Sequence, residues 1–152
     1  MLDPDLVTFV HGGVAVGVAT RDADRKPAFT RAWGPEVSGD GRTLRLCVDA
    51  PSGSATRANL EDNGAIAVGF NPPTIARGLQ IKGVASSVRE AGPEELERAE
   101  RHFVAFSVEG ARVGVSEGLL RRSFAPRDLV SVTLSIVEVF DQTPGASAGQ
   151  RV

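Results

Sequence analysis

The chain has 152 residues, of which 41% are hydrophobic and 24% are charged, and its 17 basic and 19 acidic side chains leave a formal net charge of -2. This length predicts one domain over residues 1–152, with a core large enough to need no disulfide or metal. The near-neutral charge argues against a nucleic-acid-binding protein, and the single cysteine, Cys47, can form neither an internal disulfide nor a zinc site.

Alternation of apolar with small or polar residues predicts several short strands. Val14, Val16 and Val18 show this pattern first. Turns rich in Gly and Asp, such as residues 38–41, separate consecutive strands. In chain order, strands are expected over residues 13–20, 28–37, 43–49, 65–70, 74–88 and 130–139, and short helices over residues 55–62 and 116–122.

One long amphipathic helix is predicted over residues 93–106. A proline in its first turn and the glutamates that follow suit a helix N-terminus. His102 is expected to face partly outward and to be structural. The predicted inner face of the helix holds Leu96, Ala99, Phe103 and Phe106.

These elements predict a mainly β, α+β fold. Alternating strands favour antiparallel pairing over a doubly wound parallel sheet. Six such strands are typical of a small closed barrel with flanking helices. No apolar run is long enough to cross a membrane. The N-terminus lacks a basic segment followed by a long apolar one, so we expect no signal peptide and a cytoplasmic protein.

The sequence contains none of the common catalytic or metal-binding patterns. The two histidines have no spacing that suits a metal or a catalytic triad. The glycines before the first strand precede a strand rather than join a strand to a helix, so they do not match a dinucleotide-binding loop. Cys47 alternates with Leu46 and Val48, and we interpret it as a small packed side chain.

An anion-binding site is predicted where a strand meets the first short helix. Hydroxyl groups, backbone N–H groups and the helix dipole suit a phosphate, and an arginine adds a bidentate donor. The serines could equally serve only as helix caps. The residues concerned are Ser52, Ser54, Thr56 and Arg57.

Other strands carry further candidates for ligand binding. Gln80 and Lys82 lie two residues apart on one strand and therefore share a face. Arg31 projects from the second strand. Trp33 could stack on a ligand ring or pack as a core or interface aromatic.

Four segments make the whole chain resemble the pyridoxamine 5′-phosphate oxidase-like family, the FMN-binding split barrels. They are a first hairpin over residues 14–33, a short helix with Asn59-Leu60 and its following strand over residues 54–70, the strand L-Q-I-K-G-V-A over residues 79–85, and the ending V-F-D-Q-T-P-G-A-S-A-G over residues 139–149. The terminal Trp and Arg-rich motif of vitamin B6 oxidases is absent, so oxidation of pyridoxamine phosphate is not predicted.

The resemblance implies a six-stranded split barrel that works as a homodimer, with FMN at the dimer interface. It also implies an oxidoreductase of a small molecule, in which the cofactor carries the redox chemistry. The cofactor-binding residues carried over are Arg31, Ser54, Thr56, Arg57, Gln80 and Lys82.

Two other functions on the same fold stay open at this stage. The first is a reductase that uses the deazaflavin F420, whose longer tail favours an open, basic groove around Arg31, Arg57 and Lys82. The second is a non-catalytic flavin carrier or haem-handling protein. Haem ranks last because the chain has no Tyr and neither His is placed as an axial ligand.

Overall fold

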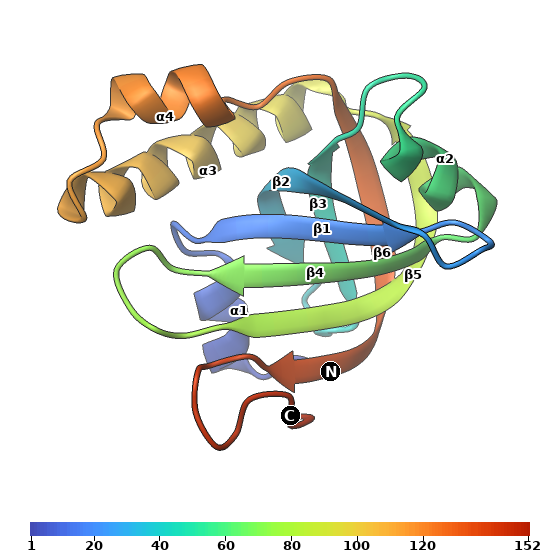
Figure 1. Ribbon diagram of the computed structural model, residues 1–152, viewed down its shortest axis with the longest axis horizontal. Coiled ribbons are helices and arrows are strands. Elements are labelled where there is room, and N and C mark those ends of the chain that lie inside the picture. The colour runs from blue at the N-terminus through green and yellow to red at the C-terminus, as the bar shows by residue number, and fades with distance from the viewer.

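The computed structural model describes residues 1–152, with six strands and four helices. The strands close an antiparallel barrel in the order β1-β2-β3-β6-β5-β4 (Figure 1), which confirms the predicted architecture. In chain order, the elements are α1 (Pro4–Val10), β1 (Ala15–Arg21), β2 (Pro27–Val37), β3 (Thr43–Asp49), α2 (Ala55–Asp62), β4 (Ala65–Asn71), β5 (Leu79–Glu90), α3 (Pro93–Arg112), α4 (Glu117–Phe124) and β6 (Leu129–Asp141).

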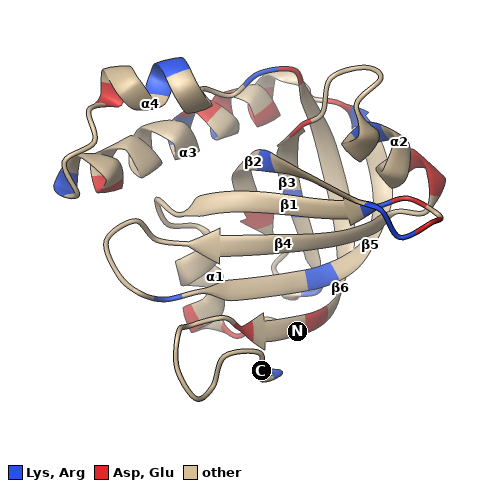
Figure 2. Ribbon diagram, viewed as in Figure 1, with Lys and Arg blue, Asp and Glu red and all other residues tan.

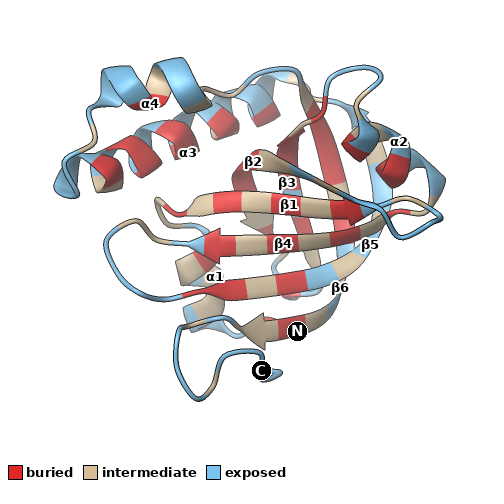
Figure 3. Ribbon diagram, viewed as in Figure 1, coloured by how far each residue is buried: buried red, intermediate tan, exposed pale blue.

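Alternate residues of the strands fill the barrel interior (Figure 3). On β1, Val16 and Val18 point inward and are buried, because successive side chains of a strand face opposite sides. Val10 of α1 and Leu60 of α2 join the same core, so both short helices are anchored to the interior. The other face of each strand is therefore free to meet a helix, solvent or a ligand.

A second, smaller core lies outside the barrel, between β2 and β3 on one side and α3 and α4 on the other. Trp33 of β2 meets the ring of Phe103 edge-on, with 5.4 Å between ring centroids. Cys47 belongs to this outer core, whereas its neighbours Leu46 and Val48 belong to the inner one. Burial raises the pKa of the Cys47 thiol to about 11, which agrees with a packed side chain.

The inner face of α3 differs from the prediction at two positions. Leu96 is 46% exposed, and its expected place is taken by the neighbouring Glu95. Glu95 can be buried because Arg89 and Ser131 each donate a hydrogen bond of 2.6 Å to its Oε1 atom. His102 is buried rather than partly outward, with 7% of its surface exposed.

Gly34 allows α3 to lie close to β2. Its φ of 58° is in the left-handed region, and a Cβ atom there would lie 3.0 Å from the backbone nitrogen of Ala99. The register between β2 and β3 shifts between Trp33 and Glu36, next to this glycine. The close packing of the helix thus depends on a residue without a side chain.

Two element boundaries differ by more than two residues from those expected. The fifth strand begins at Leu79 rather than at residue 74, because residues 72–78 form a loop after Pro72 and Pro73. The long helix continues to Arg112, where Gly110 gives room to Leu120 of α4. No helix has the length and hydrophobicity needed to span a membrane.

Candidate functional site

The outward faces of β1, β4, β5 and the first half of β2 form a continuous surface that α3 does not cover (Figure 1), whereas α3 packs over Trp33 and Gly34 of β2. Strand pairing aligns residues across it in rows. Arg31 lies opposite Gly17, Gly17 opposite Gly69, and Gly69 opposite Gln80. The neighbouring row runs from Phe29 to Lys82 through two alanines. Three residues predicted from the sequence, Arg31, Gln80 and Lys82, therefore share this surface, which we call the outer groove.

The floor of the outer groove is made of small residues. β1 and β4 contribute Ala15, Gly17, Ala19, Ala67 and Gly69. β4 carries no charged residue, and the only charged residue of β1 is Arg21 at its end (Figure 2). Two adjoining hollows share Ala19 and Ala67 and have volumes of about 410 and 240 Å³. A flat ligand could therefore lie close to the backbone of these strands.

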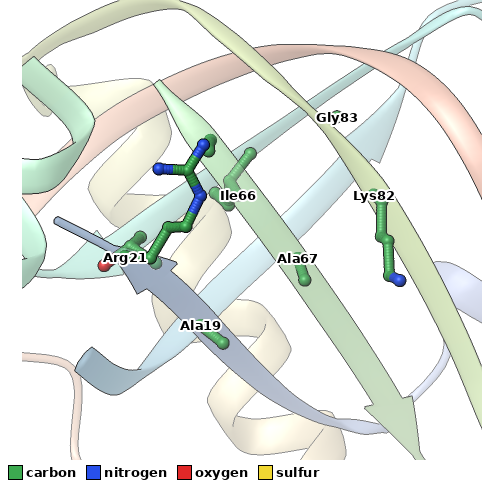
Figure 4. A pocket seen from close by; sticks show the side chains of 8 residues that line it. Ala19, Arg21, Ile66, Ala67, Lys82 and Gly83 are labelled. Carbon is green, nitrogen blue, oxygen red and sulfur yellow. The ribbon is translucent and has the colours of Figure 1, made fainter. Parts of the chain in front are cut away.

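The larger of the two hollows is bordered by two basic side chains that form no ion pair with a carboxylate. Figure 4 shows Arg21 and Lys82 on either side of the strand that carries Ala67. The Arg21 guanidinium donates only to the backbone oxygen of Asp22, at 3.2 Å. The Lys82 ammonium lies 4.6 Å from the centroid of the Phe140 ring. Both charges remain available to an anion.

Arg31 borders the smaller hollow and is also unpaired. Its guanidinium stacks on the ring of Phe124 at 3.9 Å and forms no ion pair. Partial burial lowers the pKa of Arg31, and no nearby carboxylate offsets this effect. A partly desolvated guanidinium of this kind is a ready donor for a carboxylate or phosphate.

Phe29 stands over the floor of the outer groove although it is 73% exposed. A Cβ atom on Gly17 would lie 2.7 Å from the Phe29 ring, so the ring needs a glycine beneath it. The amide side chains of Asn71 and Gln80 complete the lining of this hollow. An exposed aromatic ring beside an uncharged floor is typical of a surface that a ligand or partner covers.

The predicted phosphate site at the start of α2 lies apart from the outer groove. The Arg57 guanidinium is held by Glu61 at 3.0 Å and by Glu90 at 2.8 Å, and these hydrogen bonds raise its pKa. Ser54 caps the helix by accepting the Arg57 N–H at 3.2 Å. Thr56 is buried and Ser52 is exposed in the preceding turn. None of the four lines either hollow.

Trp33 faces outward from β2 but lies beneath α3, with only 3% of its surface exposed. His102 packs against it, with 5.8 Å between ring centroids. The other histidine, His11, accepts the backbone N–H of Val37 at its Nε2 atom, at 3.0 Å. No group of three or more His, Cys, Asp or Glu side chains is arranged to hold a metal ion.

Reasoning from the sequence missed Arg21, Phe29, Asn71 and the small-residue floor. A signal for the floor was present, because the outward positions of two strands carry only alanine and glycine before their last residues, where solvent-facing strands are usually polar. The placement of Arg21 and Lys82 along one hollow had no such signal. It depends on pairing between β1, β4 and β5.

Comparison with family models of protein sequences gives no match. A search of curated proteins also gives no match. Solved structures share the fold. HupZ of Group A Streptococcus is 21% identical and has a TM-score of 0.58, with 98% of this chain and 100% of that chain covered.

An F420 reductase is 17% identical with a TM-score of 0.57, covering 87% of this chain and 93% of that chain. An FMN-binding protein from Syntrophomonas wolfei is 14% identical with a TM-score of 0.53, covering 91% of this chain and 87% of that chain. At these identities the likeness shows the fold. The split barrel expected from the sequence resemblance is therefore confirmed as an architecture.

Proposed function

We propose that this protein binds FMN in the outer groove and transfers electrons to or from a small molecule. The observation that carries the proposal is a set of cations without carboxylate partners, Arg21, Arg31 and Lys82, around an uncharged floor of alanine and glycine. Similar folds in an FMN-binding protein and an F420 reductase support a flavin or deazaflavin as the ligand.

The residues of the outer groove fit a flavin. The floor of alanine and glycine lets a flat ring system lie against β1 and β4 beside the Phe29 ring, which itself covers Gly17. Lys82 and Arg21 would hold the phosphate, and Arg31 would place positive charge near the ring. Gln80 and Asn71 would donate or accept hydrogen bonds at the ring edge.

A flavin supplies hydride or electron transfer when bound, and the protein supplies position, charge and exclusion of water. Nothing in the groove acts as a strong general acid or base, because its lining contains no His, Asp or Glu. This composition favours redox chemistry over hydrolysis. A carrier would bind the same cofactor without turning over an electron donor.

F420 is the second candidate cofactor. The specific observation in its favour is the continuity of the two hollows, which leaves an open groove with cations along its length. A longer, negatively charged tail could follow that groove. Haem has less support, since the Nε2 atom of His11 already accepts a hydrogen bond and His102 is buried.

We also propose that the protein is a homodimer whose subunits meet over the outer groove. The groove leaves Phe29 exposed and offers an uncharged floor on one side of the molecule. A two-fold symmetric partner would shield both from water and enclose the cofactor.

Titration with FMN tests the proposed cofactor and its place. Lys82→Gln and Arg31→Gln should each weaken FMN binding about tenfold, because the first removes a charge-assisted hydrogen bond to the phosphate and the second removes positive charge near the ring. Quenching of flavin fluorescence measures the affinity. Arg57→Gln should change the affinity little, since Glu61 and Glu90 already occupy that guanidinium.

Arg101→Gln is the control, because it removes one positive charge from a solvent-exposed pair with Glu97. Equal FMN affinity in the wild type, Lys82→Gln and Arg31→Gln would overturn the placement in the outer groove. If only Arg57→Gln weakened FMN binding, the phosphate would instead be placed at the start of α2, as the sequence predicted. Binding of F420 but not FMN would select the second cofactor, and binding of neither would end the proposal.

A further inference from the structure

A third hollow lies on the far side of Arg31 from the outer groove, where the end of α4 faces β2. Its volume is about 340 Å³, near the lower limit for sites that bind small molecules. It shares Phe29 and Arg31 with the outer groove. A molecule bound here would therefore lie beside anything held on the floor of β1 and β4. We call this hollow the α4 pocket.

Two guanidinium groups without ion pairs line the α4 pocket. Arg31 stacks on Phe124 and lacks a carboxylate partner. Arg127, just beyond α4, makes only one long hydrogen bond, of 3.4 Å, to the backbone oxygen of Arg122. Two unpaired cations facing one small space attract an anion.

The pocket contains a single acidic side chain. Burial raises the pKa of Asp49, as does the nearby Asp128, and Arg127 opposes the shift. Among the residues that line the pocket, two are positively charged, Arg31 and Arg127, and one is acidic, Asp49. Thr30 already donates its hydroxyl hydrogen to the backbone oxygen of Asp49, at 2.7 Å.

Aromatic rings form the remaining walls. Phe29 and Phe124 both line the pocket, and the Arg31 guanidinium covers one face of the Phe124 ring. Phe124 is half-buried at the end of α4, whereas Phe29 is largely exposed. Flat apolar walls beside guanidinium groups suit a planar ring that carries a negative charge.

We infer that the α4 pocket binds the small-molecule substrate, and that this substrate is an aromatic carboxylate. The carboxylate meets Arg31 and Arg127, and the ring packs against the exposed Phe29 ring, because Arg31 already covers one face of Phe124. This inference rests on the proposed function only in naming the ligand a substrate, because the pocket adjoins the proposed cofactor position. Binding of the anion itself does not depend on the cofactor.

Benzoate, benzamide and inorganic phosphate are the molecules that test this inference. Their binding to the purified protein can be measured by calorimetry, without any requirement for turnover. Benzoate should bind more tightly than benzamide, which has the same ring but no charge. Benzoate should also bind more tightly than phosphate, which has charge but no ring.

Arg127→Gln should weaken benzoate binding about tenfold, since it removes a charged donor from the pocket. Arg122→Gln is the matched control, because Arg122 is exposed on α4, lies outside the pocket and holds Arg127 only through its backbone oxygen. FMN affinity should be unchanged in both variants, because neither residue lines the outer groove.

Three outcomes would overturn the inference: no binding of benzoate, equal binding of benzoate and benzamide, or equal weakening in the two variants. Phosphate binding as tight as benzoate would replace it with a simple anion site. A failure of FMN titration together with selective benzoate binding would overturn the proposed cofactor and leave the α4 pocket intact. The two proposals can thus fail separately.

Discussion

At the scale of single residues, His102 is buried without a hydrogen bond to either ring nitrogen. It lies against Trp33 and near the backbone of Gly12 and Val14. Burial lowers its pKa to about 4 from 6.5, and the two backbone groups offset this only in part. The ring is therefore neutral in the folded protein at pH 7.

This neutral histidine makes stability depend on pH. Because the folded protein binds the proton less tightly than the unfolded chain, stability falls as the pH drops through the interval from 6.5 to about 4 and levels off below it. A difference of this size corresponds to about 3 kcal/mol. His102→Phe should remove most of that loss, as measured by urea unfolding at pH 7 and pH 4. The same pH dependence in the variant would contradict the assignment.

At the scale of elements, α3 is attached to the barrel by polar contacts as well as by its apolar face. Glu95 lies in its first turn and bonds to Arg89 of β5 and Ser131 of β6. Burial alone would raise the pKa of Glu95, but these bonds and the Gly92 N–H outweigh it and lower the pKa to about 2. Glu95 therefore ties the start of α3 to two strands.

The close approach of α3 to β2 predicts a large effect at Gly34. Gly34→Ala should lower the free energy of unfolding by about 1–2 kcal/mol from the left-handed backbone alone, and further from contact with Ala99. Gly39→Ala is the control, since nothing lies within 4 Å of its Cβ position. Chemical denaturation of both variants measures the difference, and equal stability would contradict both the backbone strain and the close approach of α3.

At the scale of the whole molecule, one side of the barrel is covered by α3 and α4, and the outer groove is left without a covering helix (Figure 1). Ala67 lies near the centre of its floor. Ala67→Glu should convert the proposed homodimer to a monomer and abolish cofactor binding, because the larger side chain fills the floor and its carboxylate would pair with Lys82, which lies directly opposite on β5. Light scattering at micromolar concentration measures the mass.

Val137→Glu provides the comparison for this test. Val137 lies on β6 and is 58% exposed, so a carboxylate there stays in water. This variant should keep the mass of the wild type. A wild-type monomer, or equal dissociation of both variants, would argue against a dimer across the outer groove.

The sequence by itself determined the fold class, most element positions and the shared face of Gln80 and Lys82. Those features follow from local periodicity, because alternate residues of a strand must face opposite sides. Leu96 and His102 were misplaced, since their orientation depends on where α3 meets β2 and on the partners of Glu95. The sequence pattern within α3 carries no information about Arg89 and Ser131, the hydrogen-bond partners of Glu95 on other elements.

Only the tertiary structure decided which side chains meet across strands and between distant segments. It pairs Arg57 with Glu90, so the Arg57 guanidinium is not free to bind an anion. It also brings Phe124 and Arg127 beside Arg31. Barrel closure fixes the register of each strand, and register decides which residues are opposite one another. These contacts depend on the whole sheet, so no short stretch of sequence specifies them.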